Sequence, residues 1–197
     1  MSARKKEITP TDILPPAEYA NRRPAMRAEI VAKKKNRRLE VGPVATFYFE
    51  CYETMLQQVQ EMLHIEKGGE AQIADELTAY NPLIPKGNEL VATVMFEIDD
   101  PLRRGRALGR LGGVENTMFI KLGDDKIMGV SEEDVDRTNA EGKASSVQFV
   151  HFPFTRAQIE KFRAPGATII LGIDHPNYAH MAVMSDAVRA ELAGDFD

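Results

Sequence analysis

The stretch from Ser146 to His180 carries the clearest succession of hydrophobic and polar patterns in the chain. Residues 147–152 fall into two alternating sets, as the two faces of a strand require. Thr155, followed three residues later by Gln158, is a capping-box signal for the start of a helix. The Ala-Pro-Gly sequence at 164–166 ends that helix. A strand followed by a short helix is therefore predicted here.

The same stretch continues with a second strand and a turn. The apolar run at 167–173 is rich in isoleucine, which suits a buried strand. Asp174 and His175 then precede Pro176, and proline is common at the first position of a helix. The pattern predicts a closing helix from Pro176 to about Leu192, with polar side chains at the carboxyl end of the strand before it.

The rest of the chain shows similar patterns. Strands are predicted where apolar, β-branched and aromatic residues gather, and helices where apolar positions recur every three or four residues. The predicted strands are 44–50, 89–98, 117–122 and 126–130. The predicted helices are 24–38, a strongly amphipathic one from Tyr52 to Gly68, 70–78, and one that Asp99-Asp100-Pro101 opens and Gly112-Gly113 ends.

A strand–helix–strand succession thus occurs twice, at 91–122 and at 147–173. Such a succession predicts an α+β fold with a five- or six-stranded mixed sheet that helices cover on at least one face. We expect a single domain at 41–197, preceded by a basic helical arm at 1–40. The arm is expected to pack on the body or on a partner.

Composition narrows the class of protein. Of the 197 residues, 43% are hydrophobic, enough for a sizeable core. No uninterrupted apolar stretch reaches the roughly 18 residues of a membrane span, and no apolar segment follows the basic residues at the start, as a secretory signal would require. The single cysteine, Cys51, excludes an internal disulfide and favours a reducing compartment. A cytoplasmic location without membrane contact is expected.

Charge is unevenly distributed, although the net charge is only −5. Residues 1–40 contain eleven Lys and Arg but five Asp and Glu, and the remainder is acidic. A basic arm can contact nucleic acid, its own acidic body or a neighbouring subunit. No aromatic residues interleave with these charges, which disfavours nucleic acid.

Several catalytic signatures are missing from the sequence. There is no zinc-binding cysteine spacing, phosphate loop, dinucleotide fingerprint or nucleophile elbow. Cys51 lies between a predicted strand and a predicted helix start, where a thiolate would be favoured. A small packing residue is the more frequent role of a free cysteine.

Two groups of polar residues remain as candidates. Glu61 and His64 lie three apart, so both can face one metal ion from one side of a helix; an exposed polar pair is the alternative. Asp174 and His175, with Tyr178 close behind, stand at a strand end where a histidine can act as base or ligand. The alternative is that Asp174 caps the closing helix and His175 fills the turn.

Several short phrases together are similar to a known family. They are Thr11-Asp12-Ile13-Leu14, Gln60-Glu61-Met62 with Glu66, Tyr80 to Pro85, Glu89-Leu90, Val147-Gln148-Phe149, and His175-Pro176 with Tyr178. In this order they resemble the bacterial domain of unknown function 3501 family over nearly the whole chain. The resemblance implies a single cytoplasmic domain without an assigned activity. Members are often encoded beside rubrerythrin-like and iron–sulfur proteins, which implies a link to peroxide or redox physiology.

Three hypotheses follow. The first is a small-molecule or metal-binding domain, with or without enzymatic activity, for which a divalent metal is one candidate cofactor. Its acid/base residues would be Glu61 and His175, its substrate-binding residues Tyr80, Asn81, Glu89 and Tyr178, and its metal ligands Glu61, His64, Asp174 and His175. The second is a non-catalytic assembly protein that forms a homodimer or binds a redox protein. The third is nucleic-acid binding through the arm. The first requires Glu61 and His175 to lie within one ligand's reach.

Overall fold

The structure, a computed structural model, describes residues 5–132, 138–140 and 142–197, and the strands within these residues form two antiparallel sheets. The first sheet has the order β1 (Arg38–Val41), β2 (Ala45–Phe49), β3 (Glu89–Phe96), β7 (Val147–Pro153), β6 (Val130–Ser131). The second has the order β5 (Asp125–Met128), β4 (Met118–Leu122), β8 (Ile169–His175), β9 (Tyr178–Val183). The described α-helices are α1 (Pro16–Lys34), α2 (Tyr52–Glu66), α3 (Gly69–Tyr80), α4 (Pro101–Leu108), α5 (Arg156–Arg163) and α6 (Asp186–Leu192). Short 3-10 helices are η1 (Pro10–Asp12), η2 (Asn81–Leu83), η3 (Val114–Asn116) and η4 (Ala193–Asp195).

The two sheets pack face to face, and their inner faces form the main hydrophobic core. Alternate residues of each strand point inward because side chains in a strand alternate between its two faces. Val94 of β3, Ile120 of β4 and Leu171 of β8 are completely buried in this core. At one edge the chain passes between the sheets at Gly129, where a Cβ atom would lie 2.4 Å from a methyl group of Val150.

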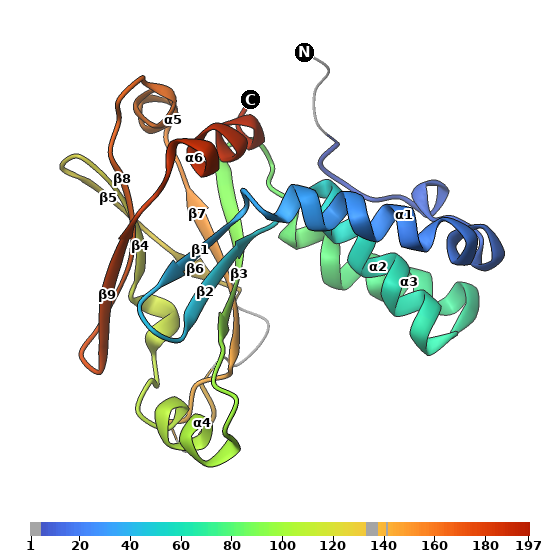
Figure 1. Ribbon diagram of the computed structural model, residues 1–197, viewed down its shortest axis with the longest axis horizontal. Helices are drawn as coiled ribbons and strands as arrows, with labels where there is room; N and C mark the ends of the chain where they lie inside the picture. Colours follow the sequence, from blue (N-terminus) through green and yellow to red (C-terminus); the bar gives the residue numbers. More distant parts are fainter. Residues whose placement is uncertain (1–4, 133–137, 141) are drawn as a thin grey trace.

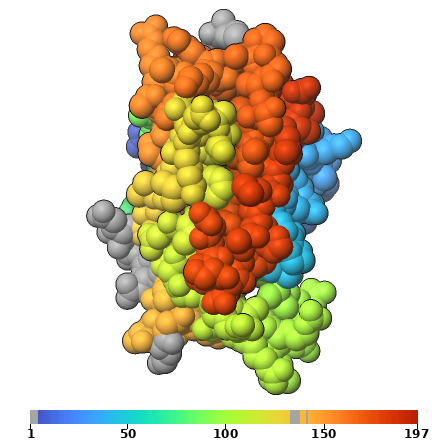
Figure 2. All heavy atoms as spheres, turned by 90° about the vertical axis from the view of Figure 1, so that its left-hand side faces the viewer, coloured from blue at the N-terminus to red at the C-terminus, as the bar shows by residue number. Residues whose placement is uncertain are grey.

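The helices α1, α2 and α3 form a third layer beside the first sheet (Figure 1). A second hydrophobic cluster joins this layer to the sheet, and its buried members include Met55 and Val59 of α2 and Val91 of β3. Strand β3 therefore has neighbours on both faces, which explains its almost continuous apolar sequence. Among the described residues, no such helical layer covers the outer face of the second sheet, and strands β4, β5, β8 and β9 are visible from that side (Figure 2).

The α+β class is confirmed, but the sheet arrangement differs from the predicted single mixed sheet. Both strand–helix–strand units carry the chain from one sheet to the other: β3 leads through α4 to β4, and β7 leads through α5 to β8. The two strands of each unit therefore do not pair with each other, and the pairs that form instead, β3 with β7 and β4 with β8, are antiparallel. Helix α5 (Arg156–Arg163) begins directly after the predicted cap, where Thr155 and Gln158 exchange hydrogen bonds of 2.9 and 3.3 Å.

The predicted closing helix from Pro176 is wrong over its first half. Pro176 and Asn177 form the tip of a hairpin, in which His175 pairs with Tyr178. Strand β9 follows, so His180 lies on a strand, and α6 begins only at Asp186. Among the described residues, no helix is long and apolar enough to cross a bilayer.

The N-terminal residues are tied to the rest of the chain. Helix α1 packs beside α2, and Arg38–Val41 forms the edge strand β1. Several basic side chains in this region have carboxylate partners: Arg22 with Glu18, Arg23 with Glu61, Lys33 with Glu53, Arg37 with Asp195, and Arg38 with Glu40. Part of the positive charge of residues 1–40 is thus balanced within the molecule.

Candidate functional site

The residues predicted to share one site lie in different layers. Glu61 belongs to α2 in the helical layer, whereas His175 ends β8 in the second sheet, with the first sheet between them (Figure 1). Nowhere in the described parts of the chain do three or more His, Cys, Asp or Glu side chains form a group that could hold a metal ion. The predicted metal set of Glu61, His64, Asp174 and His175 is therefore not assembled.

His175 stabilises the hairpin between β8 and β9, and Asp174 connects β8 to β5. The His175 ring is buried; its Nε2 lies 3.2 Å from the carbonyl oxygen of Gly112, and its Nδ1 accepts from the backbone N–H of Asn177. The exposed Asp174 carboxylate pairs with Lys126 at 3.1 Å. Both ring nitrogens of His175 are thus engaged by the backbone, so the ring fills the turn.

Tyr178, predicted to bind substrate, connects the two sheets at their other edge. Its hydroxyl donates to the carbonyl oxygen of Val41 at 2.8 Å and accepts from the N–H groups of Val44 and Ala45 at 3.1 and 3.0 Å. These three contacts hold the turn between β1 and β2 against β9. The hydroxyl of Tyr178 therefore has a structural role.

Asn81 and Glu89, two further predicted substrate-binding residues, also have partners within the chain. The Asn81 amide accepts from the N–H of Ile8 at 2.7 Å and donates to the carbonyl oxygen of Ile8 at 2.9 Å, as a neighbouring strand would. Glu89 Oε2 lies 2.9 Å from Nδ1 of His151. Tyr80, by contrast, lines a cavity between the helices and the first sheet.

Glu61 lies at the centre of a polar network between α1 and α2. Nε and Nη2 of Arg23 donate to its two carboxylate oxygens at 2.8 and 2.7 Å, and the Tyr19 hydroxyl donates at 2.5 Å. The hydrogen bonds from Arg23 lower the pKa of Glu61 to about 2. Burial, together with the hydrogen bond to Glu61, raises the pKa of Tyr19 to about 12. A carboxylate with so low a pKa is poorly suited to general acid/base catalysis near neutral pH.

A pocket of about 770 Å³ opens beside this network. Its walls come from η1 and the segment after it, the start of α1, the last turns of α2 and the first turns of α3. The lining residues are mainly apolar: Pro10, Ile13, Leu14, Pro15, Pro16, Ala17, Leu63, Gly69 and Ile73, with Tyr19, Gln60, His64, Lys67 and Glu70 as the polar members. The volume falls in the range of pockets that bind small molecules.

The N-terminal wall of the pocket is fixed by a buried glutamine. Gln60 Oε1 accepts from the backbone N–H of Leu14 at 2.9 Å, and Gln60 is only 2% exposed. Asn81 fixes the same segment further upstream at Ile8. The wall is thus held by polar contacts to α2 and η2, although it has little regular structure of its own.

The His64 side chain can form a hydrogen bond with a ligand in this pocket. Its ring contacts the Tyr19 ring edge-on, with centroids 5.7 Å apart. No hydrogen bond joins its ring nitrogens to another described residue, and the side chain is partly exposed. Lys67, at the left-handed cap of α2, adds a cationic group nearby.

Sequence reasoning identified Glu61 and His64 but missed the pocket itself. The segment 10–17 has no hydrophobic period, because four of its residues are prolines or threonines that form short turns. A signal that could have located it is the phrase Thr11-Asp12-Ile13-Leu14, one of the phrases on which the family resemblance rests. That phrase contributes two apolar pocket residues, Ile13 and Leu14.

The Glu61 network predicts a specific dependence of stability on pH. Because the folded-state pKa of Glu61 is lowered from 4.5 to about 2, its contribution is present above pH 4.5 and is lost as the pH falls toward 2. Glu61→Gln should therefore reduce the free energy of unfolding at pH 6, and the difference from wild type should shrink between pH 4.5 and pH 2. Urea unfolding at several pH values measures this.

The matched control is Glu18→Gln, which changes an exposed carboxylate on α1 that pairs with Arg22. Such exposed helix pairs contribute about 0.3–0.5 kcal/mol, so this variant should remain close to wild type. A Glu61→Gln difference as large at pH 2.5 as at pH 6 would contradict the assignment of the lowered pKa.

Comparisons with known proteins match nearly the whole chain. The family model described as "Protein of unknown function (DUF3501)" matches residues 7–196. A solved structure, described as a novel protein of unknown function from Burkholderia pseudomallei K96243, is 37% identical in sequence. The matched region includes 96% of this chain and 99% of the chain in that structure, with a TM-score of 0.89. No curated protein matches.

Proposed function

The chain belongs to the DUF3501 family of proteins of unknown function, and the description of that family names no activity. From the geometry of the pocket, we propose that the protein binds a small, mainly apolar molecule in the helical layer. The observation that carries the proposal is the pocket of about 770 Å³ with apolar walls and few polar groups. Sites for small molecules have this composition, because apolar surface supplies affinity and a few polar groups fix the orientation.

The polar groups indicate the character of one end of the ligand. His64 and Lys67 can both donate hydrogen bonds, and both line the pocket near the carboxyl end of α2. Tyr19 and Glu61 are already joined to each other and to Arg23 and Gln57. Glu70 also lines the pocket, from the first turn of α3, so a ligand with an apolar body fits best with an anionic or hydrogen-bond-accepting end placed beside His64 and Lys67.

The proposal concerns binding and includes no catalytic step. Arg23 and Tyr19 hold both carboxylate oxygens of Glu61, and the imidazole of His175 belongs to a hairpin in the second sheet. The hypothesis of a Glu/His/Asn/Tyr pocket is thus replaced by an apolar pocket beside Glu61 and His64.

The fluorescent probe 8-anilinonaphthalene-1-sulfonate tests the proposal, because it combines aromatic rings with an anionic group. We expect a saturable fluorescence increase with the wild-type protein. In Ala17→Trp, an indole at the pocket wall should displace the probe and weaken its binding by about tenfold, which corresponds to about 1.4 kcal/mol.

Ala20→Trp is the matched control, since it places the same indole on the same helix at an exposed residue that does not line the pocket. It should bind the probe as the wild-type protein does. Equal binding by Ala17→Trp and the wild type would refute the proposal, and so would the absence of saturable binding.

A further inference from the structure

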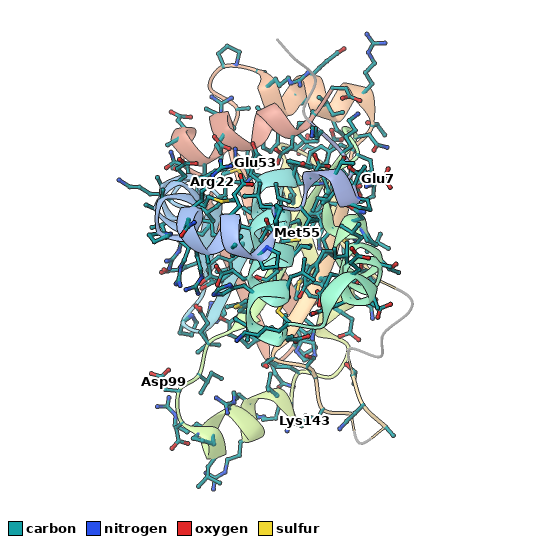
Figure 3. All side chains as sticks on the ribbon, turned by 90° about the vertical axis from the view of Figure 1, so that its right-hand side faces the viewer. Glu7, Arg22, Glu53, Met55, Asp99 and Lys143 are labelled. Atoms are coloured by element: carbon teal, nitrogen blue, oxygen red, sulfur yellow. The ribbon has the colours of Figure 1, made fainter. Side chains whose placement is uncertain are left out.

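We propose that a second cavity, on the outer face of the first sheet, binds the ammonium group of a small organic cation. The cavity has a volume of about 220 Å³ and lies between β2, β3 and β7 on one side and the ends of α1 and α3 with the first half of α2 on the other. It shares no lining residue with the apolar pocket described above, so this site is independent of the proposed function. Figure 3 looks onto the helical layer, and Met55, one of the lining residues, lies near its centre.

The carboxylate of Glu50 forms the polar part of this cavity. Glu50 follows the last residue of β2 and is only 5% exposed. Its two carboxylate oxygens accept hydrogen bonds from the hydroxyls of Thr93 at 2.7 Å and Thr54 at 2.6 Å. Thr93 belongs to β3 and Thr54 to the first turn of α2, so the carboxylate is held by elements on both sides of the cavity.

Glu50 has no cationic side chain as a partner within the part of the chain that the structure describes. The Arg37 guanidinium donates to the backbone oxygen of Glu50 at 2.8 Å, but its ion pairs are with Asp195 and Glu191. A buried carboxylate is costly unless a positive charge or several hydrogen bonds compensate it. Two hydroxyl donors compensate Glu50 only in part, so a cation in the cavity would lower its electrostatic cost.

The remaining walls suit an organic cation better than a metal ion. Tyr48, Tyr80 and Phe149 supply aromatic rings, and Met55 and Leu83 supply apolar contacts. Aromatic faces attract ammonium groups, the more strongly where water is excluded. Metal ions instead need several anionic or imidazole ligands, and the described residues contain no group of three such side chains.

Lys34 lies at the rim and provides a second, directional test. It lines the cavity from the end of α1 but forms no ion pair with Glu50. Its ammonium group repels a cation bound in the cavity and weakens the attraction between that cation and the Glu50 carboxylate. Removal of this charge by Lys34→Met should therefore strengthen the binding of an ammonium ligand.

The probes are n-butylammonium and 1-butanol, which have nearly the same size but differ in charge. Chemical-shift changes in ¹H–¹⁵N spectra of the full chain measure binding of each. We expect saturable shifts around Thr54 and Thr93 with n-butylammonium and at least tenfold weaker binding of 1-butanol. Glu50→Gln should weaken n-butylammonium binding by about tenfold or more, equivalent to about 1.4 kcal/mol.

Glu97→Gln is the matched control. The Glu97 carboxylate also accepts from two hydroxyls on this face of the sheet, those of Thr46 and Tyr48, but Glu97 does not line the cavity. This variant should bind n-butylammonium as the wild type does. If Glu50→Gln fails to fold, Lys34→Met decides the question by its expected gain in affinity. Equal binding of the two probes, equal losses in the two glutamine variants, or no gain in Lys34→Met would each overturn the proposal.

Discussion

Arg37→Ala is expected to lower the free energy of unfolding by about 3–5 kcal/mol, the cost of breaking a buried ion pair by removing one partner. The Arg37 side chain is completely buried and donates to both carboxylate oxygens of Asp195 at 2.5 and 3.2 Å. It also donates to the backbone oxygens of Phe49 and Glu50. The substitution would leave the Asp195 carboxylate buried without its guanidinium partner.

Urea unfolding of the wild type and the variant measures this effect. Arg38→Ala is the control, because Arg38 is the next residue and pairs with Glu40 in an exposed position. Exposed pairs contribute about 0–1 kcal/mol. A loss in Arg37→Ala no larger than that in Arg38→Ala would show that Arg37 does not link the start of β1 to the C-terminal η4.

Tyr178→Phe is expected to lower the free energy of unfolding by about 2–3 kcal/mol. The substitution keeps the ring but removes a hydroxyl that serves the carbonyl oxygen of Val41 and the N–H groups of Val44 and Ala45. Buried polar groups left without a partner cost about 1–3 kcal/mol. The hydrogen bonds lost in the variant are those that join the β1–β2 turn to β9.

Thermal or urea unfolding tests this prediction, with Tyr48→Phe as the control. The Tyr48 hydroxyl donates to Glu97 at the surface, where water can replace it. Its loss should change stability by less than about 1 kcal/mol. If the two tyrosine variants were equally stable, the hydroxyl of Tyr178 would not join the two sheets as we describe.

Local patterns in the sequence predicted much of the secondary structure. The alternation of 147–152, the capping box at Thr155 and the three-four spacing of α2 are each produced by neighbours along the chain, so they could be recognised without the fold. The hairpin at Pro176 could not. Its strand β9 exposes Met181 and Val183 at an edge of the second sheet, so it lacks the alternation of apolar and polar residues that indicates a strand.

The candidate site depended on contacts between distant segments, and those could not be predicted. Gln57 and Gln60 are polar residues of α2, a helix that the sequence predicts to be amphipathic, yet both are buried. Helix α1 and the segment before it cover them, through Tyr19 and Leu14. The family resemblance was confirmed, but the residues of its phrases have partners that stabilise the fold: Asn81 with Ile8 and Tyr178 with Val41.

The two hydrophobic clusters lie on opposite faces of the first sheet. Leu90 and Val91 are consecutive in β3, but Leu90 belongs to the cluster between the sheets and Val91 to the cluster under the helices. The sheet therefore separates the packing under the helices from the packing between the two sheets. Side chains on one face of β3 can therefore be changed without direct contact with the cluster on its other face.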